Sequence, residues 1–404
     1  MTIDLQQSDD EIPTDTILAV VEKALAIPEE RSKGRIYFLD ALRAIAVLLV
    51  LWGHVFLVGI NDPATVSIWV PDIKGFLFGP NTIADNIHGQ LGLVVVLATG
   101  VNPGGLGVAI FFLVSGFVIL RTIDRSPPGK FLVHRFFRII PTCAAAVLLV
   151  SFLTLLYCEI KHVPQPNTIK GIITSTFALN YYNGSFQTIP VLWTLEIEML
   201  FYLLISIIAK CAGRLRIEVI FTVSMMLVTF DACMASPLAT RLDPTTHFVF
   251  SHISIIFISL NYMLIGSFIY RVYTGESSRK DYIYGASIAS LYVLSACIYE
   301  MSTGRSTPGM NIPETGAALV IFLLALWAGM RSRWLAPLRW IGDISYSLYL
   351  VHIPIGWGIL TFLGRHGWGM NSAAVTTTVC VIFLAWLMHK YVEIPSQRLG
   401  KRIA

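Results

Sequence analysis

Ten apolar runs, separated by polar segments, dominate this sequence of 404 residues. The runs cover roughly residues 38–60, 104–121, 139–158, 190–209, 216–235, 249–271, 282–300, 313–330, 341–363 and 373–391. A bilayer core requires about 20 apolar residues per helix and offers no water to an open backbone. Only 13% of the residues are charged, against about a quarter in soluble domains. The sequence therefore predicts an all-α, polytopic membrane helix bundle with about ten transmembrane helices.

The distribution of Lys and Arg orients this predicted bundle. If the N-terminus is cytoplasmic, 22 of the 29 basic residues fall in cytoplasmic segments and six on the opposite side, while Arg43 lies inside the first run. This bias predicts an even number of spans with both termini cytoplasmic. We therefore divide the chain into a cytoplasmic N-terminal tail at 1–35, a transmembrane domain at 36–398 and a C-terminal tail at 399–404. The first segment is polar and acidic before Arg31, unlike a secretory signal.

Several classes of function lack support in the composition. No arginine–aromatic stripe or groove-reading motif indicates binding of nucleic acid, and the net charge of +4 mainly reflects sidedness. The six cysteines are scattered, without a CxxC pair or a spacing typical of metal ligands. We interpret them as small packing residues. We expect no metal site and no tightly bound cofactor.

Three polar residues lie inside the first apolar run, where such residues are costly. Asp40 precedes Arg43 by three positions and can pair with it on one helix face. Eleven positions separate Arg43 from His54, which places both side chains on one stripe, about 16 Å apart along the axis. A neutral imidazole can act as a general base. The alternative is a histidine that is satisfied by a neighbouring helix.

Two carboxylates open the fourth run, between Trp193 and Tyr202. Glu196 and Glu198 point about 200° apart on a helix, so they cannot both face one interior site. Glu198 shares a face with Thr194 and Tyr202, and inside a bundle it needs a cationic partner from the first run. Glu196 is expected at the mouth of the span, facing water.

Small residues characterise the second run, which also contains Ser115. Gly104, Gly107 and Gly116 allow either a neighbouring helix or a ligand to approach the backbone closely. Helix packing is the simpler interpretation.

Two arginines stand just before the third run, ahead of Pro141. Arg135 and Arg138 lie on one helix face at i and i+3, and two guanidinium groups can clamp a phosphate. Contact with lipid headgroups is the alternative.

A polar stripe marks the start of the ninth run. Ser345, Tyr349 and His352 share a helix face, and Tyr346 and Pro354 lie in the same segment. Hydrogen bonding between helices explains such a stripe as readily as a functional site does.

Together, these segments resemble the acyltransferase-3 family of integral membrane acyltransferases, whose members modify polysaccharides, lipopolysaccharide, lipo-oligosaccharides and some macrolides. The matching motifs are Leu39-Asp40-x-Leu42-Arg43 with His54, Gly107-Val-x-Ile-Phe-Phe-Leu-Val-Ser115-Gly116-Phe117, Arg135-x-x-Arg138-Ile-x-Pro141, Leu192-Trp193-Thr194-Leu195-x-x-Glu198-x-x-Phe201-Tyr202, Ser345-Tyr346-x-x-Tyr349-Leu350-x-His352-x-Pro354 and Val392-Glu393-x-Pro395. They occur in order over roughly residues 35–398. Ala109 departs from an acidic residue that is common in the family, and Met199 and Leu200 replace a common polar pair.

The resemblance implies roles for these residues. It marks His54 as the catalytic histidine, with Arg43 as its motif partner, and Glu198 as a functional carboxylate. Arg135 and Arg138 are implied contacts to acyl-CoA on the cytoplasmic side. We expect Arg43 and Ser115 to join the acyl-CoA site. The residues expected to support the site are Asp40, Trp193, Tyr202, Tyr346, Tyr349 and His352.

The resulting hypothesis is a membrane O-acyltransferase of the bacterial inner membrane. It would move an acyl group, most simply acetyl, from cytoplasmic acyl-CoA to a hydroxyl of a cell-envelope or exported glycan. His54 would deprotonate that hydroxyl, and a covalent acyl-histidine is a second possibility. Homo-oligomers or an envelope-glycan assembly are possible partners.

Two rival functions come from other classes. A proton-coupled secondary transporter also uses interior Arg, His and Glu side chains. It favours two related halves, whereas the Arg43–His54 motif has no counterpart in the second half. A scaffold subunit of an envelope-polysaccharide machine would tolerate loss of His54.

Overall fold

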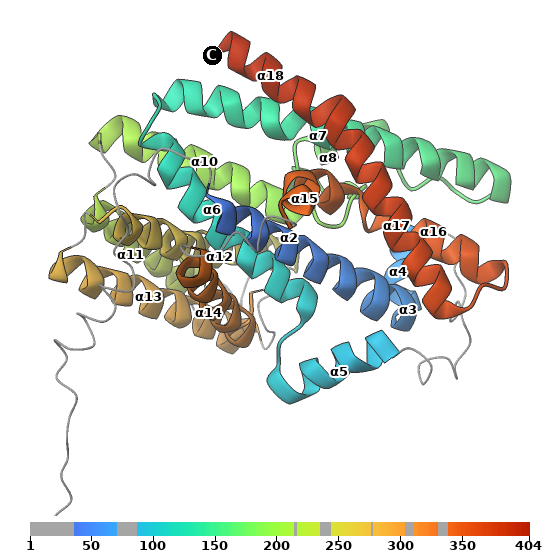
Figure 1. Ribbon diagram of the computed structural model, residues 1–404, viewed down its shortest axis with the longest axis horizontal. Coiled ribbons are helices and arrows are strands. Elements are labelled where there is room, and N and C mark those ends of the chain that lie inside the picture. The colour runs from blue at the N-terminus through green and yellow to red at the C-terminus, as the bar shows by residue number, and fades with distance from the viewer. Residues whose placement is uncertain are drawn as a thin grey trace, which may run out of the picture.

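The computed structural model describes residues 36–70, 87–213, 216–234, 244–275, 278–303, 310–329 and 338–404. All regular elements in these ranges are helices (Figure 1), which confirms the predicted fold class. The N-terminal tail at 1–35 lies outside the described residues.

Within the described residues, each of the ten apolar runs coincides with one or more helices. In chain order these elements are α2 (Tyr37–Trp52), η2 (Gly53–Val58), α3 (Gly59–Asn61), α4 (Pro63–Trp69), α5 (Ile87–Thr99), α6 (Pro103–Ile123), α7 (Pro128–Lys161), α8 (Ile169–Thr176), α9 (Asn180–Asn183), α10 (Leu192–Ala212), α11 (Ile217–Met234), α12 (Pro244–Tyr273), α13 (Arg279–Thr303), α14 (Ile312–Gly329), α15 (Arg339–Val351), α16 (Pro354–Arg365), α17 (Met370–Met388), η6 (His389–Glu393) and α18 (Ile394–Ile403). Among the described residues, seven helical stretches are long and apolar enough to cross a membrane, and the bent pair α15–α16 could make an eighth. The number of spans and the side of the termini stay predictions.

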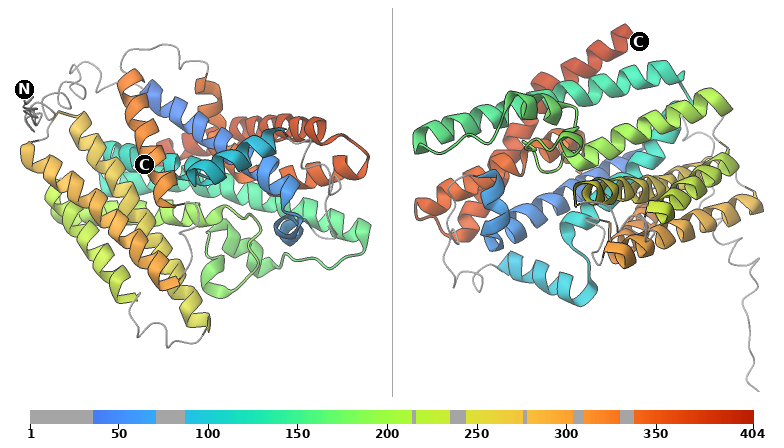
Figure 2. Two further views of the ribbon diagram at one scale, coloured as in Figure 1. Left: turned by 90° about the horizontal axis from the view of Figure 1, so that it is seen from below. Right: turned by 180° about the vertical axis from the view of Figure 1, so that it is seen from behind.

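Helices α2 and α6 pack against each other at the centre of the bundle. Helix α6 also contacts α12 and α14, and α2 contacts α15 (Figure 1). Helices α11, α12 and α13 lie side by side, as both views in Figure 2 show. A Cβ atom at Gly107 would clash with the Ala46 carbonyl of α2, and one at Gly116 with the Met263 carbonyl of α12. These two glycines therefore serve close helix packing.

The beginning of α6 is held next to His54. Asn102 caps this helix, since its Oδ1 accepts the N–H of Gly104 at 2.8 Å. The backbone N–H of Asn102 donates in turn to Glu314 of α14 at 3.2 Å. A Cβ atom at Gly104 would lie 3.7 Å from Cε1 of His54. The first turn of α6 thus forms one wall around the histidine.

Two π-helical segments, η2 and η6, interrupt the regular helices. Such turns insert an extra residue into the helical repeat and occur frequently at functional sites. The segment η2 contains His54, and η6 contains His389 and Glu393. The α-helical geometry that places Arg43 and His54 on one stripe therefore ends at Trp52, just before the histidine.

Two of the observed helical stretches differ in shape from the spans that the sequence predicts. The run at 341–363 breaks into α15 and α16, which meet at 73°. The break coincides with Pro354 at the start of α16, because proline cannot continue the hydrogen-bond ladder of the preceding helix. In α7, by contrast, Pro141 lies inside a continuous helix of 34 residues. Arg135 and Arg138 are consequently part of the same long helix as the third run.

Candidate active site

A narrow cavity of about 80 Å³ lies where α2, α6, α7, α10 and α15 meet. We call it the inner cavity. Its polar lining residues are Arg43, Ser115, Arg135, Arg138, Thr194, Glu198, Ser345, Tyr346 and Tyr349. Residues that are far apart in the sequence, and that were predicted for the site, thus share one cavity.

Glu198 is the carboxylate of the inner cavity. Its Oε1 accepts a hydrogen bond from Ser115 Oγ of α6 at 3.3 Å, and another from the hydroxyl of Tyr202, one turn further along α10. Arg43, Arg135 and Arg138 line the same cavity, so cations outnumber carboxylates there by three to one. A cavity with this balance suits an anionic ligand.

The side chain of Arg135 is fixed by two aromatic rings and a hydroxyl group. Its guanidinium carbon lies 5.1 Å from the ring centroid of Phe131 and 5.2 Å from that of Tyr202, a cation–π geometry. It also donates to Thr122 Oγ1 at 2.9 Å. The residue is only 7% exposed. Arg135 therefore supplies positive charge from a fixed position in the wall.

A wider polar cavity of about 300 Å³, here called the vestibule, adjoins the inner cavity. Arg43, Arg138, Ser345 and Tyr346 line both. The other polar residues of the vestibule are Asp40, Arg121, Asp343, His389, Glu393 and Gln397. The two arginines therefore lie at the boundary between the vestibule and the inner cavity.

The predicted ion pair in the first run is present at the vestibule. Arg43 Nη1 lies 3.6 Å from Oδ1 of Asp40, three residues earlier. The pairing reduces the cost of burying both groups. It also leaves Arg43 at the junction between the vestibule and the inner cavity.

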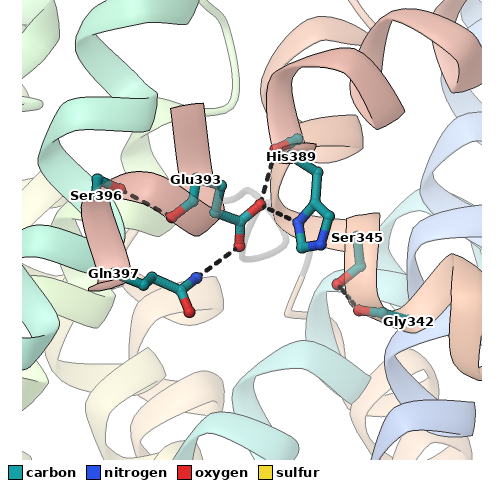
Figure 3. A network of polar contacts seen from close by, with 7 residues as sticks. Gly342, Ser345, His389, Glu393, Ser396 and Gln397 are labelled. Atoms are coloured by element: carbon teal, nitrogen blue, oxygen red, sulfur yellow. Dashed lines mark hydrogen bonds and ion pairs between the residues drawn. The ribbon is translucent and has the colours of Figure 1, made fainter. Parts of the chain in front are cut away.

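Glu393 is the centre of a hydrogen-bond network in the lining of the vestibule (Figure 3). It accepts hydrogen bonds from Ser347 Oγ at 2.8 Å and from Gln397 Nε2 at 3.1 Å, and it pairs with His389 Nδ1 at 2.9 Å. The carboxylate is buried, at 3% exposure. His389 and Gln397 lie four positions before and after Glu393 along the chain, whereas Ser347 reaches it only because α15 packs beside η6.

His54 lies beyond the inner cavity rather than in its lining. Its Nδ1 is 3.3 Å from Nε2 of His352, and the two ring centroids are 5.0 Å apart. The ring of His352 lies 5.6 Å from that of Tyr349, which does line the cavity. A chain of ring contacts thus joins the inner cavity to His54.

Trp357 holds the backbone on the other side of His54. Its Nε1–H donates to the His54 carbonyl oxygen at 2.9 Å. The same carbonyl also accepts the backbone N–H of Gly59, the residue that follows η2. The tryptophan therefore ties α16 to the helix that carries the histidine.

Trp193, Glu196 and Glu198 of the fourth run lie in three different surroundings. Glu196 was expected to face water, and this is wrong: it is 3% exposed and pairs with His252 Nε2 at 3.0 Å. Trp193 packs edge-to-face on Phe112, with centroids 6.3 Å apart, and is not among the cavity-lining residues. Glu198 lies in the inner cavity, so the structure does not bring it into contact with His54.

Sequence reasoning missed Glu314 and Asn102 near His54. An Asn-Pro pair at the start of an apolar run is a helix-start signal, and it could have revealed the cap at Asn102. No local signal connects Asn102 to Glu314, because the two lie on different helices. Likewise, nothing near Glu196 in the sequence indicates His252.

This arrangement defines a chemical class. A multi-helix membrane bundle holds an arginine-rich cavity, and a buried histidine lies at the end of that cavity. Such a site suits transfer of a group from an anionic donor with proton transfer by an imidazole. Among the described residues, no three His, Cys, Asp or Glu side chains form a group that could hold a metal ion.

Comparison with known families agrees with this class. Residues 36–390 match the model of the acyltransferase domain family, Acyl_transf_3. The chain therefore belongs to this family, and it is an acyltransferase enzyme. The transporter and scaffold alternatives are set aside on this ground.

Three curated relatives share about a quarter of their residues with the chain. A protein of Komagataeibacter xylinus, named as a membrane-bound transacylase, BcsY, is 26% identical, covering 75% of this chain and 80% of that protein. The exopolysaccharide production protein ExoZ of Rhizobium meliloti is 28% identical, over 62% and 75% of the two chains. YrhL of Bacillus subtilis, named as a peptidoglycan O-acetyltransferase, is 23% identical, over 74% and 52%. No solved structure matches the chain.

Proposed function

We propose that this enzyme transfers an acyl group, most simply acetyl, from acyl-CoA to a hydroxyl of a cell-envelope or exported glycan. The observation that carries the proposal is the inner cavity, where three arginines lead from the vestibule towards Tyr349 and the histidine pair. The names of the relatives, which include an exopolysaccharide production protein and a peptidoglycan O-acetyltransferase, support a glycan acceptor.

In this proposal acyl-CoA enters through the vestibule. We take this entrance to be cytoplasmic, where acyl-CoA is made, because Arg121 and Arg138 belong to the excess of basic residues predicted for the cytoplasm. Arg138 and Arg43 would contact the phosphates at the junction of the two spaces, with Arg121 further out. Arginine suits this task because its guanidinium can donate two parallel hydrogen bonds to a phosphate. Arg135, already engaged by Thr122, would contribute long-range attraction.

The chemical step uses His54 as a general base. Its Nε2 takes the proton from the acceptor hydroxyl while that oxygen attacks the thioester carbonyl carbon. The carbon–sulfur bond then breaks, the acyl group stays on the acceptor oxygen as an ester, and the thiolate of CoA receives the proton from the imidazolium. Each turnover thus converts one thioester and one hydroxyl into one ester and one thiol.

Tyr349 lies on the path between the donor and His54. Its hydroxyl shares a hydrogen bond with Thr194 Oγ1 at 2.9 Å, and its ring contacts both Phe111 and His352. In the proposal the thioester stops beside this ring, and a small rotation of the ring admits the acyl group to His54. Glu198 keeps Ser115 and Tyr202 in place beside the arginines, which is a supporting role away from the histidine.

The test is release of CoA by the purified full-length protein in lipid nanodiscs. Acetyl-CoA is added with and without oligosaccharides taken from the exopolysaccharide and peptidoglycan classes that appear in the relatives' names. We expect acceptor-dependent release of CoA, with an acetyl ester on the acceptor found by mass spectrometry. The His54→Gln variant serves as the inactive control. CoA release that ignores every acceptor, or that persists unchanged in this variant, would contradict the proposal.

A further inference from the structure

Two histidines from distant parts of the chain face each other at the end of the inner cavity. His54 comes from η2, and His352 from the break between α15 and α16. Their nearest ring nitrogens, Nδ1 of His54 and Nε2 of His352, are 3.3 Å apart. His352 is 1% exposed. Because buried polar groups are costly without partners, the position of each hydrogen on these rings matters.

The backbone determines which nitrogen carries the hydrogen on each ring. Nδ1 of His54 is 2.8 Å from the Val50 carbonyl oxygen, and Nδ1 of His352 is 2.7 Å from the Tyr349 carbonyl oxygen. A carbonyl oxygen only accepts hydrogen bonds, so both Nδ1 atoms must donate. A neutral imidazole has one N–H. Nε2 of each neutral ring therefore holds a lone pair.

This assignment gives His352 a specific relation to His54. The lone pair on Nε2 of His352 faces the Nδ1–H of His54, which is shared between His352 and the Val50 carbonyl. If the hydrogen of His54 moved to Nε2, its Nδ1 lone pair would face both of these acceptors. Each of these contacts would then lose its hydrogen bond. The pair thus favours the tautomer of His54 that leaves Nε2 free to accept a proton.

We infer that His352 is a positioning residue that reinforces the ring tautomer of His54 set by the Val50 carbonyl and stabilises the protonated form of His54. When Nε2 of His54 takes a proton, the bond from its Nδ1–H to His352 becomes charge-assisted and stronger. His352 stays neutral and accepts, in the place that an aspartate occupies in hydrolase triads. The catalytic consequence rests on the proposed function, whereas the tautomer does not.

The fold supplies the rigidity that this role requires. The 73° break places His352 at the end of α15 rather than in mid-helix, where its N–H bonds to Leu348 O at 3.1 Å. The Trp357 bond to the His54 carbonyl holds the two segments together from α16. The start of α6 closes the remaining side near Gly104.

Two substitutions of His352 separate positioning from simple packing. In His352→Asn, the amide N–H can still donate to Tyr349 O, but the side chain is too short to reach His54. In His352→Gln, the amide oxygen can occupy the place of Nε2 and accept from His54. We expect kcat to fall about 10–100-fold for Asn, by analogy with the residues that orient a metal-binding histidine, with KM for acetyl-CoA unchanged. Gln should recover most of kcat.

The matched control is His366→Asn. His366 also donates from Nδ1 to a carbonyl of its own helix, Phe362 O at 2.7 Å, but it is exposed at the end of α16. This variant should keep wild-type kcat. Equal kcat for wild type and His352→Asn would overturn the inference. So would an equal loss in the Asn and Gln variants that comes with a raised KM.

A spectroscopic measurement tests the tautomer without turnover. The chain has nine histidines, so nitrogen-15 labelling of histidine alone gives a small spectrum, and His54→Gln and His352→Gln assign the two rings. We expect both neutral rings to carry hydrogen on Nδ1 in the wild type, and His54 to become a mixture in His352→Asn. Hydrogen on Nε2 of His54 in the wild type would refute the inference. Absence of acyl transfer with the expected spectrum would refute only the proposed function.

Discussion

The inner cavity and the histidine pair are neighbouring regions that are held in different ways. In the inner cavity, side chains from separate helices hold one another, as Ser115 of α6 and Glu198 of α10 do. At the histidine pair, each ring is held first by a carbonyl of its own helix, as His54 is by Val50. The charged groups of the inner cavity thus depend on contacts between distant helices. The hydrogen on Nδ1 of His54 is held by a carbonyl four residues earlier and, in addition, by one distant partner, His352. The two regions should respond differently to substitution.

The largest effect is expected for His54→Ala. Removing a general base costs about 10²–10⁴-fold in rate, so acyl transfer should nearly vanish. The affinity for acetyl-CoA should stay unchanged, because His54 lies outside the lining of the inner cavity. Rate is measured as CoA release, and affinity by calorimetric titration of the solubilised protein. A large loss of affinity would show that the two regions do not act separately.

Arg138→Ala should change the affinity for acetyl-CoA rather than the rate of acyl transfer. Loss of a charge-assisted hydrogen bond costs about 1.5–3 kcal/mol, which is roughly a 10–100-fold rise in the Kd for acetyl-CoA. Arg125→Ala is the control, since this arginine is exposed in the connection between α6 and α7 and lies outside both cavities. Similar titrations for both variants would remove Arg138 from the donor site.

Glu393→Gln probes the wall of the vestibule. The change keeps the size of the side chain but removes the charge that pairs with His389. We expect unfolding to become easier by about 1–3 kcal/mol, seen as a lower Tm. Glu159→Gln, at an exposed carboxylate near the end of α7, should leave Tm unchanged. An unchanged Tm for Glu393→Gln would indicate that this network contributes little to stability.

The smallest effect is expected at the boundary of the two regions. Tyr349→Phe keeps the ring between the inner cavity and His352 but removes the hydrogen bond to Thr194. Such a bond contributes about 0.5–1.5 kcal/mol, so kcat should fall by roughly 2–10-fold. Thr194→Val should have the same effect, and the double variant should be no worse than either single one. Additive losses would mean that the two hydroxyls act independently.

Local sequence signals predicted the framework of both regions. The apolar runs marked the helices, whereas the Asn102 cap of α6 and the helix break at Pro354 emerged only with the structure. The i, i+3 spacing predicted the Asp40–Arg43 pair. The π-helical turn at His54 left no such signal, since one added residue in the hydrogen-bond ladder changes neither composition nor spacing.

The sequence by itself determined an all-α membrane bundle, membership of an acyltransferase family, and most of the residues that gather at the site. Only the tertiary structure decided their distant partners: Glu196 against His252, Arg135 against Tyr202, and His352 against His54. The physical reason is how far apart in the sequence the interacting residues lie. Helix periodicity and capping depend on residues within a few positions, whereas the partner of a buried polar group depends on which helix packs beside it.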